Sequence, residues 1–341
     1  MVTTRQVRLV QRPTGLPDDD TWEVTTDELP EPGEGEFLVE IDHISLDPAM
    51  RGWLDDVPSY LPPVRLGAVM RAQGTGTVSQ SRHPDFPVGA AVTGTFGVTE
   101  RAVSDGTGVR VIDTSIAGPA TWLGALGMTG LTAFHGLHEV GELAAGDTVV
   151  ISAAAGAVGS VAGQIAHAAG ATVIGIAGGP EKCAWLREIG FDAAIDYKSE
   201  DVPRRLREVA PDGIDIYFDN VGGEILDAAL ANLRRGARVI LCGAIASYNA
   251  TTPPPGPRRY MSLLVNRARM QGFLVFDYPE KDAAAIASLA AMAAEGSLVS
   301  RETVVDGSVA DFGATFCACS AVRTPESWYC ASLRFLKKLF I

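Results

Sequence analysis

The sequence predicts an α/β protein in which a doubly wound parallel sheet accompanies a second, β-rich domain. Apolar runs at 148–153, 172–177 and 214–221 alternate with helical stretches, and further runs follow at 193–197, 238–243 and 272–276. Continuous apolar strands between helices are typical of a parallel sheet that is covered on both faces. The first third instead holds short β-type runs, such as 37–45, between turns rich in Gly and Pro. An Ala-rich helix is predicted over 281–296, with Gly296 at its C-terminal cap.

Length, composition and charge bound the classes of function. The 341 residues suffice for two domains, and 47% hydrophobic with 20% charged residues is ordinary for a soluble globular protein. A net charge of −13, spread along the chain, argues against nucleic-acid binding. No apolar run reaches the roughly 18 residues of a membrane-spanning helix, and no apolar block near residue 1 indicates a signal peptide. Five scattered cysteines form no disulfide pattern, so we expect a cytoplasmic protein without a membrane partner.

A glycine-rich turn follows the strand predicted over 148–152 and precedes the helix predicted over 160–169. Its sequence is Ala154-Ala155-Gly156-Ala157-Val158-Gly159, with Ala154 in place of the first glycine of G-x-G-x-x-G. Gly156 would let the backbone approach a pyrophosphate, and Gly159 would let the helix pack close to the strand. The helix N-terminus offers free N–H groups to phosphates. We interpret the turn as a dinucleotide site of a Rossmann fold, against the alternative of an ordinary tight turn.

The strand over 172–177 should end near the adenine ribose of that dinucleotide. NAD-binding proteins usually place an acid there to accept a hydrogen bond from the 2′-hydroxyl. This strand instead runs into Gly178 and Gly179, and Lys182 and Tyr197 supply a cation and a phenol suited to a 2′-phosphate. Glu181 is the counter-argument, although on the first helical turn we expect it to point to solvent. The sequence therefore predicts NADPH rather than NADH.

Five segments together resemble one family. They are 45–52 (SLDPAMRG), 127–133 (GMTGLTA), 153–163, 218–223 (FDNVGG) and 242–249 (CGAIASYN). The chain resembles the zinc-independent medium-chain dehydrogenase/reductases, in the branch of prostaglandin, alkenal double-bond and curcumin reductases, from about Gln6 to about Phe312. The resemblance implies a GroES-like domain over 1–126, an NADPH-binding Rossmann domain over 127–303, a return to the first domain over 304–341, and a homodimer.

The resemblance also implies an activity and site residues. The activity is NADPH-dependent reduction of the C=C bond of α,β-unsaturated ketones and aldehydes. By matching motif, Lys182 and Tyr197 would hold the 2′-phosphate, and Thr129 would lie near the cofactor at the domain junction. The remaining cofactor-binding residues are expected at the glycine turn and on the nicotinamide side: Ala155, Gly156, Val158, Gly159, Gly178, Asn220, Gly243, Ile245 and, on a strand over 273–275, Phe273 and Val275.

Tyr248 is the candidate catalytic residue. Hydride addition to the β-carbon of an enone leaves an enolate, and a neutral hydroxyl at the carbonyl oxygen stabilises that charge. Tyr248 follows a predicted strand end, where such sites open. The alternative, a turn residue that packs over the 253–255 loop, stays open. Arg51, Tyr60 and Tyr260 are weaker substrate-pocket candidates, with a structural salt bridge as the alternative for Arg51.

A metal site is not predicted. Zinc-dependent relatives need Cys and His ligands, whereas Cys is absent from the first 182 residues. Where relatives carry a Gly-His-Glu segment, this chain has 66–69 (LGAV). Two other readings of the function remain: a quinone reductase of the same superfamily, which the Asn220 and Tyr248 motifs disfavour, and a non-catalytic NADPH-binding relative. The loops 55–71 and 247–260 are expected to shape the pocket without revealing the substrate.

The tail departs from the family after Phe312. The segment 315–330 holds three of the five cysteines, which lack a clear fourth metal ligand. We hypothesise a shifted reading frame, because reading 327–330 two bases on within each codon gives Leu-Val-Leu, as in the usual final strand. Resequencing the gene tests this, and an unshifted frame through Phe316 excludes it. If the tail is as written, we expect the closing strand to be lost and 332–341 to form a short basic helix.

Overall fold

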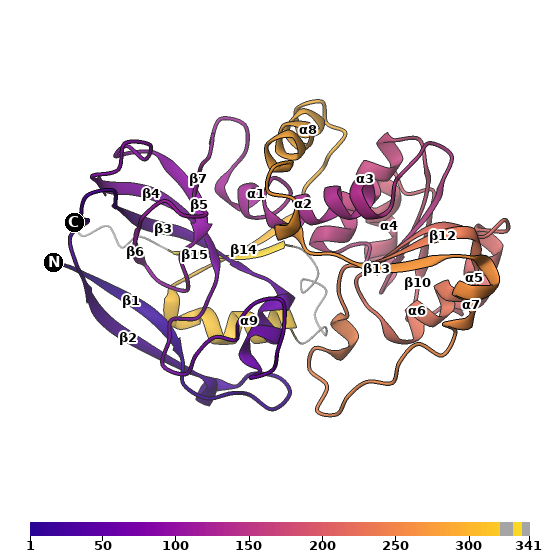
Figure 1. The fold of residues 1–341 in the computed structure, drawn as a ribbon, viewed down its shortest axis with the longest axis horizontal. Coiled ribbons are helices and arrows are strands. Elements are labelled where there is room, and N and C mark those ends of the chain that lie inside the picture. Colours follow the sequence, from indigo (N-terminus) through magenta and orange to yellow (C-terminus); the bar gives the residue numbers. More distant parts are fainter. Residues whose placement is uncertain (321–329, 336–341) are drawn as a thin grey trace. The chain divides into compact units, whose positions relative to one another are not determined.

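The computed structural model describes residues 1–320 and 330–335, and the chain divides into two compact units (Figure 1). Unit 1 comprises Met1–Leu123 and Glu302–Ile341, and unit 2 comprises Gly124–Arg301. Each unit has a hydrophobic core of its own. The predicted fold class, a parallel α/β sheet with a separate β-rich domain, is confirmed.

Unit 2 is built on a six-stranded parallel sheet. The strand order is β10-β9-β8-β11-β12-β13, so the direction of winding reverses between β8 and β11, where Rossmann-type folds bind their ligands. Five of the six apolar runs read from the sequence overlap the strands β8 to β12. Strands that are buried on both faces need apolar side chains along their length. The strands are β8 (Thr148–Ser152), β9 (Thr172–Ala177), β10 (Ala193–Asp196), β11 (Ile214–Asp219), β12 (Leu233–Leu241) and β13 (Arg269–Gly272).

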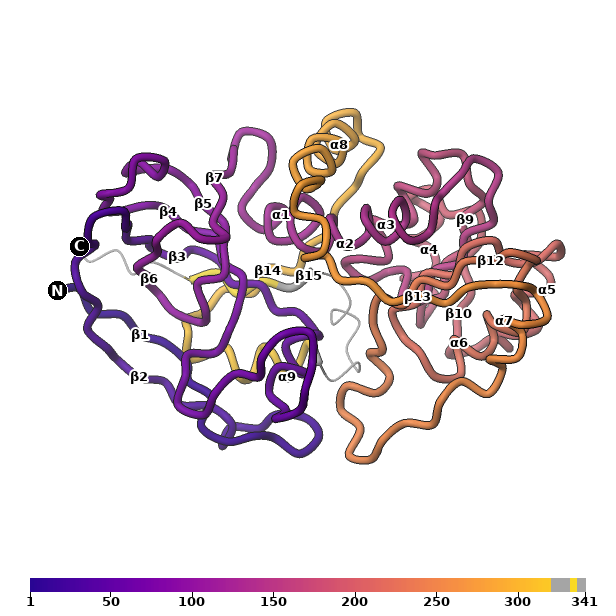
Figure 2. Tube along the Cα trace, in the orientation of Figure 1, coloured from indigo at the N-terminus to yellow at the C-terminus, as the bar shows by residue number. Residues whose placement is uncertain are grey.

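Helices cover both faces of this sheet. The helices α3 and α4 follow β8 and β9 on one face, while α5 and α6 lie on the other and contact each other (Figure 2). The helices are α2 (Met128–His135), which continues as a π-helical turn (Gly136–Val140), α3 (Ala157–Ala168), α4 (Pro180–Glu188), α5 (Val202–Val209), α6 (Gly223–Leu230), α7 (Met261–Asn266) and α8 (Asp282–Ala294). Gly296, with φ +76°, follows α8 as the predicted cap.

Unit 1 is rich in antiparallel strands. Its larger sheet has the order β14-β15-β3-β4-β5-β7, with β6 also paired to β3, and β1 and β2 form a separate hairpin. The strands are β1 (Val2–Leu9), β2 (Trp22–Leu29), β3 (Phe37–Leu46), β4 (Gln73–Ser81), β5 (Ala91–Thr95), β6 (Arg101–Ser104), β7 (Arg110–Val111), β14 (Glu302–Gly307) and β15 (Cys330–Phe335). The helices are α1 (Pro119–Leu123) and α9 (Phe312–Ser320), and 3-10 turns span Asp19–Thr21, Pro48–Leu54 and Val309–Asp311.

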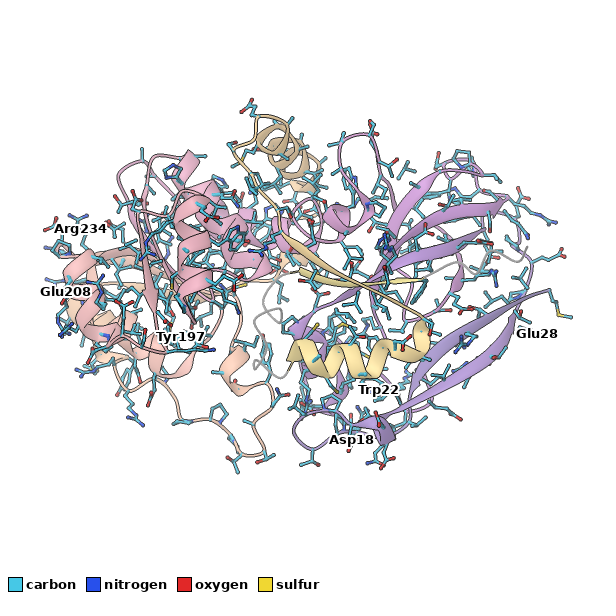
Figure 3. The ribbon with its side chains drawn as sticks, turned by 180° about the vertical axis from the view of Figure 1, so that it is seen from behind. Asp18, Trp22, Glu28, Tyr197, Glu208 and Arg234 are labelled. Atoms are coloured by element: carbon cyan, nitrogen blue, oxygen red, sulfur yellow. The ribbon has the colours of Figure 1, made fainter. Side chains whose placement is uncertain are left out.

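Trp22 anchors α9 to the hairpin of unit 1. Its ring meets Phe312 edge-on at 5.1 Å and Phe316 at 6.2 Å, and Figure 3 shows Trp22 beside this helix. Phe312 and Phe316 stack on each other at 5.7 Å, as residues four apart on one helix face can. Both phenylalanines are fully buried, so the first turns of α9 belong to the core of unit 1.

The predicted strand over 272–276 is wrong, and with it the strand placement of Phe273 and Val275. Strand β13 lies earlier, and its pairing with β12 ends where Leu241 meets Gly272. Beyond that point the Asp277 carboxylate accepts a hydrogen bond from the Leu274 backbone N–H at 3.2 Å. This contact favours the 3-10 turn Val275–Asp277 over a longer strand.

The expected loss of a closing strand is also wrong. Residues Cys330–Phe335 form β15, which pairs in parallel with β14 and antiparallel with β3. Residues 332–335, which were expected in a helix, therefore form part of this strand. The two neighbouring strands offer their backbone groups hydrogen-bond partners on both sides. Residues 321–329 and 336–341, on which much of the frame-shift hypothesis falls, lie outside the described residues.

Within residues 1–320 and 330–335, no helix combines the length and apolar character that crossing a membrane requires.

Candidate cofactor and active site

The glycine turn joins β8 to α3 and is held by the neighbouring strand. The Ala154 N–H donates to the Ile176 carbonyl on β9 at 3.0 Å, and the Gly156 N–H donates to the Ala153 carbonyl at 2.9 Å. The left-handed residue is Ala153, with φ +47°, so Ala154 makes the turn without a positive φ. The substitution of Ala154 for glycine is therefore compatible with the turn.

Helix α3 begins at Ala157, three residues earlier than predicted. Gly156 is its N-cap in an extended conformation, so the first-turn N–H groups, including that of Val158, lie directly after Ala155 and Gly156. A side chain at Gly159 would come within 2.5 Å of the Ala153 carbonyl oxygen. Only glycine permits this close approach of helix and turn, and the helix N-terminus provides donors and a dipole for an anionic group.

A second group of predicted residues gathers at the end of β9. A side chain on Gly178 would lie within 2.9 Å of the Tyr197 ring, so the glycine leaves that face of the phenol open to the backbone. Tyr197 follows β10 and is labelled in Figure 3. Lys182 lies on the first turn of α4 and is largely buried. Burial, and then the charge of Lys198, lower the pKa of Lys182 to about 8.

Asp196 also lies here, and the sequence analysis missed it. Asp196 is the last residue of β10, one residue before Tyr197, and its carboxylate accepts hydrogen bonds from the neighbouring loops. Oδ1 accepts from the N–H groups of Gly179 at 2.7 Å and Lys198 at 3.0 Å, and Oδ2 accepts from the Ser199 hydroxyl at 2.8 Å. Asp196 therefore shapes the loop. Glu181 points to solvent as expected, since 75% of its side chain is exposed.

Asp219 is the polar centre at the switch between β8 and β11. Its Oδ1 accepts four hydrogen bonds at 3.0–3.1 Å, from the hydroxyls of Ser152 and Tyr217 and from the backbone N–H groups of Val221 and Gly222. Its backbone carbonyl accepts from the N–H groups that follow β12, at Cys242 and Gly243. The ends of three strands are thus tied together through one residue.

The Asp219 side chain is almost completely buried. Burial raises the pKa of this carboxyl even though two backbone N–H groups and two hydroxyls donate to it. Its Oδ2 has no hydrogen-bond partner among the described residues. The next residue, Asn220, donates from its backbone to the Ser152 hydroxyl and from its side-chain amide to the Ser152 carbonyl, both at 2.8 Å. The turn after β11 is therefore fixed to the end of β8.

Tyr248 folds back over the end of β12. The Ala244 N–H donates to the Tyr248 hydroxyl at 3.3 Å, and the same oxygen lies 3.0 Å from the position that a side chain on Gly243 would occupy. Ile245 donates its N–H to the Asn220 carbonyl at 3.2 Å. The structure therefore brings Asn220, Gly243, Ile245 and Tyr248 together at the end of β11 and β12.

The other unit 2 candidates are more dispersed. The Thr129 hydroxyl on α2 is buried and has no hydrogen-bond partner among the described residues. Phe273 packs edge-on against Phe218 with ring centroids 6.5 Å apart, and Val275 is half-buried in the turn after it. Tyr260, at the start of α7, is exposed.

Two candidates lie in unit 1. The Arg51 guanidinium is buried and donates to the carbonyls of Gly15 at 2.8 Å and Pro13 at 3.4 Å, and it pairs with Asp55 at 2.8 Å. These contacts agree with the alternative that the sequence left open, in which Arg51 forms a structural salt bridge. Tyr60 is about half exposed, and its hydroxyl lies 3.4 Å from the Trp53 indole nitrogen.

Among the residues that the structure describes, no three His, Cys, Asp or Glu side chains gather as a metal ion would require.

Comparisons with known proteins give the family. Residues 5–112 match the N-terminal domain of oxidoreductase, and residues 157–292 match the family described as zinc-binding dehydrogenase. The NADPH-dependent curcumin reductase of Escherichia coli is 39% identical, over 88% of this chain and 88% of its own. Prostaglandin reductase 1 of Rattus norvegicus is 37% identical, over 90% of this chain and 93% of its own.

The chain belongs to the prostaglandin and curcumin reductase branch of the zinc-independent medium-chain dehydrogenase/reductases. A solved structure agrees: CurA from Vibrio vulnificus in complex with NADPH has a TM-score of 0.90 and 38% identity, and the match covers 98% of this chain and 99% of CurA. The family resemblance drawn from the five sequence segments is thereby confirmed.

Replacing Asp219 by Ala tests its role in this reductase. Four donors would lose one shared acceptor, so we expect the free energy of unfolding to fall by about 2–4 kcal/mol. Tyr217→Phe removes a single donor and should cost only about 1 kcal/mol. Urea unfolding of the wild type and both variants measures the difference. Equal stability of Asp219→Ala and the wild type would contradict the role of Asp219 as the common acceptor.

Proposed function

We propose that this chain reduces the C=C bond of α,β-unsaturated ketones and aldehydes with NADPH. The observation that carries the proposal is a pair of features in unit 2 that suit anionic groups. They are the turn at Gly156, where α3 begins, and the group of Gly178, Lys182 and Tyr197. The relatives support it, since the Escherichia coli curcumin reductase is described as NADPH-dependent and CurA was solved with NADPH.

The residues fit this cofactor. The first-turn N–H groups of α3 would bind the pyrophosphate, which the close approach at Gly159 permits. Lys182 would pair with the 2′-phosphate and Tyr197 would donate to it, because a cation and a phenol suit that group and both lie at the end of β9 beside Gly178. The buried Thr129 hydroxyl, which has no hydrogen-bond partner among the described residues, is a further group that a ligand could satisfy.

When bound, the cofactor supplies the hydride that is added to the β-carbon of the enone. The enone gains negative charge on its carbonyl oxygen as the enolate forms, and a proton from water at the α-carbon completes the reduction. The Tyr248 hydroxyl would donate a hydrogen bond to that oxygen and so favour the transition state over the ground state. The Asp219 network would hold the backbone of Asn220 and Gly243 beneath Tyr248.

The test of the proposed function is to mix the protein with NADPH and 3-nonen-2-one and follow the absorbance of the reduced nicotinamide. Oxidation of NADPH with formation of the saturated ketone supports the proposal. Turnover with a quinone but no enone would support a quinone reductase, and tight NADPH binding without any turnover would support a non-catalytic relative.

The role of Tyr248 is tested by Tyr248→Phe. If the hydroxyl stabilises the enolate, kcat should fall by about 100-fold while KM for NADPH changes little. Steady-state kinetics with 3-nonen-2-one measures both constants. An unchanged kcat would favour the alternative in which Tyr248 only packs its own turn.

Lys182 should set the preference for NADPH over NADH. In Lys182→Gln, we expect kcat/KM for NADPH to fall by about 10- to 100-fold and that for NADH to stay near the wild type. Because its pKa lies near 8, Lys182 carries its proton at pH 7 and loses it as the pH rises, so the preference should decline from pH 7 to 9. Lys281→Gln, which removes a lysine paired with Glu139, is the control. A preference that Lys182→Gln leaves intact would contradict this assignment.

We propose that two copies pair through the edge of the parallel sheet. Strand β13 ends the sheet and pairs only with β12 among the described strands. Helix α7, which packs against β12 and precedes β13 in the chain, exposes Leu264 and Val265, with 69% and 63% of their surfaces accessible. An open strand edge favours association with a second sheet edge, and exposed apolar side chains on the preceding helix favour burial in an interface.

Val265→Glu should convert such a homodimer to a monomer, because it would bury an unpaired charge at the interface. Val88→Glu is the matched control, since Val88 is equally exposed (64%) but lies in unit 1. Size-exclusion chromatography with light scattering measures the mass of each. A monomeric wild type, or a dimer unaffected by Val265→Glu, would contradict the proposed interface.

We also propose a cytoplasmic location. The four cysteines whose side chains the structure describes, at positions 183, 242, 317 and 319, are free thiols. Free thiols fit a reducing compartment, in which NADPH is also available.

A further inference from the structure

A second lysine lies beside the group of Gly178, Lys182 and Tyr197 in unit 2. Lys198 is the second residue after β10, and it is exposed. A side chain on Gly178 would come within 3.0 Å of the Lys198 Cε atom and within 2.8 Å of the Tyr197 ring. The stem of the lysine and the phenol therefore border the same point of the loop that follows β9.

The backbone holds Lys198 in this place. The Asp196 Oδ1 atom accepts hydrogen bonds from two loops, namely from the N–H groups of Gly179 at 2.7 Å and of Lys198 at 3.0 Å. The Tyr197 N–H also donates to the Ala177 carbonyl at 3.0 Å. These three hydrogen bonds fix the loop after β10 against the loop after β9, so the position of Lys198 does not depend on its own side chain.

The charges of the two lysines act on each other. Burial lowers the pKa of Lys182 most, and the positive charge of Lys198 lowers it further. Glu181 acts in the opposite sense, but its side chain is exposed and lies 4.0 Å from Arg301. Asp196 attracts Lys198 and so offsets part of the repulsion. Two ammonium groups that repel each other are an arrangement that a bound anion would relieve.

The 2′-phosphate of NADPH is an anion of suitable charge. A phosphate monoester carries roughly −1.5 to −2 at pH 7, so a single lysine leaves roughly −0.5 to −1 without a partner. The ammonium group of Lys198 ends a flexible stem with rotatable donors. It can therefore turn toward a phosphate that Lys182 and Tyr197 bind.

We propose that Lys198 is a second residue that determines the preference for NADPH, because it supplies the second cation for the 2′-phosphate. The proposal rests on the cofactor of the proposed function and adds one specificity-determining side chain to it. Lys182 is buried on α4 and provides a fixed charge, whereas the exposed Lys198 provides a mobile one.

The test is isothermal titration with NADP⁺ and with NAD⁺ at pH 7 and low salt. In Lys198→Gln, we expect the ratio of NADP⁺ affinity to NAD⁺ affinity to fall by about 5- to 20-fold, with NAD⁺ binding little changed. Lys198→Arg should keep most of the ratio, because arginine retains the charge. Since Lys198 is exposed, neither change removes packing from the core of unit 2.

Lys281→Gln is the matched control, because it removes the same charge from unit 2 at a lysine that pairs with Glu139. Its ratio of NADP⁺ to NAD⁺ affinity should equal that of the wild type. If Lys198→Gln keeps the wild-type ratio, or Lys281→Gln loses it equally, the proposed role of Lys198 is wrong.

Proton uptake gives a readout that a merely structural role of Lys198 would not change. With its pKa lowered to about 8, Lys182 has lost its proton in about half of the molecules at pH 8. A bound phosphate raises that pKa again, so NADP⁺ should take up about half a proton as it binds, and NAD⁺ should take up none. Titration at pH 8 in two buffers of different ionisation enthalpy measures this uptake.

The neighbouring groups do not titrate at this pH. Hydrogen bonds from Gly179, Ser199 and Lys198 outweigh burial and keep the pKa of Asp196 low, and burial raises the pKa of Tyr197. Lys198→Gln removes a neighbouring positive charge, so more of Lys182 is protonated before binding and the uptake should be smaller. An uptake equal to that of the wild type would overturn the proposal.

These measurements separate the proposal from the activity, because they require no turnover. A wild type that does not prefer NADP⁺ to NAD⁺ overturns both this proposal and the NADPH assignment. A wild-type preference that persists in Lys198→Gln overturns only the role of Lys198. A preference that depends on Lys198, in a protein that reduces no enone, supports this role and contradicts the proposed activity.

Discussion

The carboxyl group of Asp219 is the interaction on which the candidate site depends. It lies where the winding of the parallel sheet reverses, and it ties the turn after β11 to the end of β8, while its backbone carbonyl binds the first residues after β12. Neighbouring parallel strands are not joined by tight hairpins, so no short covalent connection holds their ends in register. The buried Asp219 carboxyl, which accepts hydrogen bonds from four donors, holds these strand ends together instead. Its burial raises the pKa of this carboxyl.

In both the glycine turn and the turn after Asp219, backbone segments approach each other closely at the end of a strand. The two turns allow this approach in different ways. At Gly159 a helix approaches the backbone so closely that a Cβ atom would not fit, and the approach is made possible by the absence of a side chain. At Asp219 a polar side chain fills the space and satisfies the backbone N–H groups of Val221 and Gly222. The first arrangement leaves helix N–H groups available to a ligand, whereas the second uses its N–H groups internally and fixes the neighbours of Tyr248.

The parts predicted correctly from the sequence are those that local pattern determines. The predicted bounds of β9 agree with the structure, because a short apolar run from Val173 to Ala177 between two turns is typical of a buried strand. Other features depend on contacts distant in sequence. The end of β13 depends on the length of β12, Asp196 is occupied by donors from two loops, and the positive φ falls on Ala153 rather than on the glycine positions that the motif emphasises. A sequence motif lists residue types, but it does not specify which backbone group each side chain will satisfy.

The tail shows a conflict between what the sheet requires and what the side chains provide. The gap between β14 and β3 is filled by β15, whose Leu333 is buried as a strand there demands. The neighbouring Ser332 is equally buried, and its hydroxyl has no hydrogen-bond partner among the described residues, which costs about 1–3 kcal/mol. The buried Thr75 hydroxyl on β4 of the same sheet likewise has no hydrogen-bond partner among the described residues, so such a group is not peculiar to the tail. The position of β15 is therefore set by its backbone pairing with β14 and β3, and the frame-shift hypothesis stays a prediction.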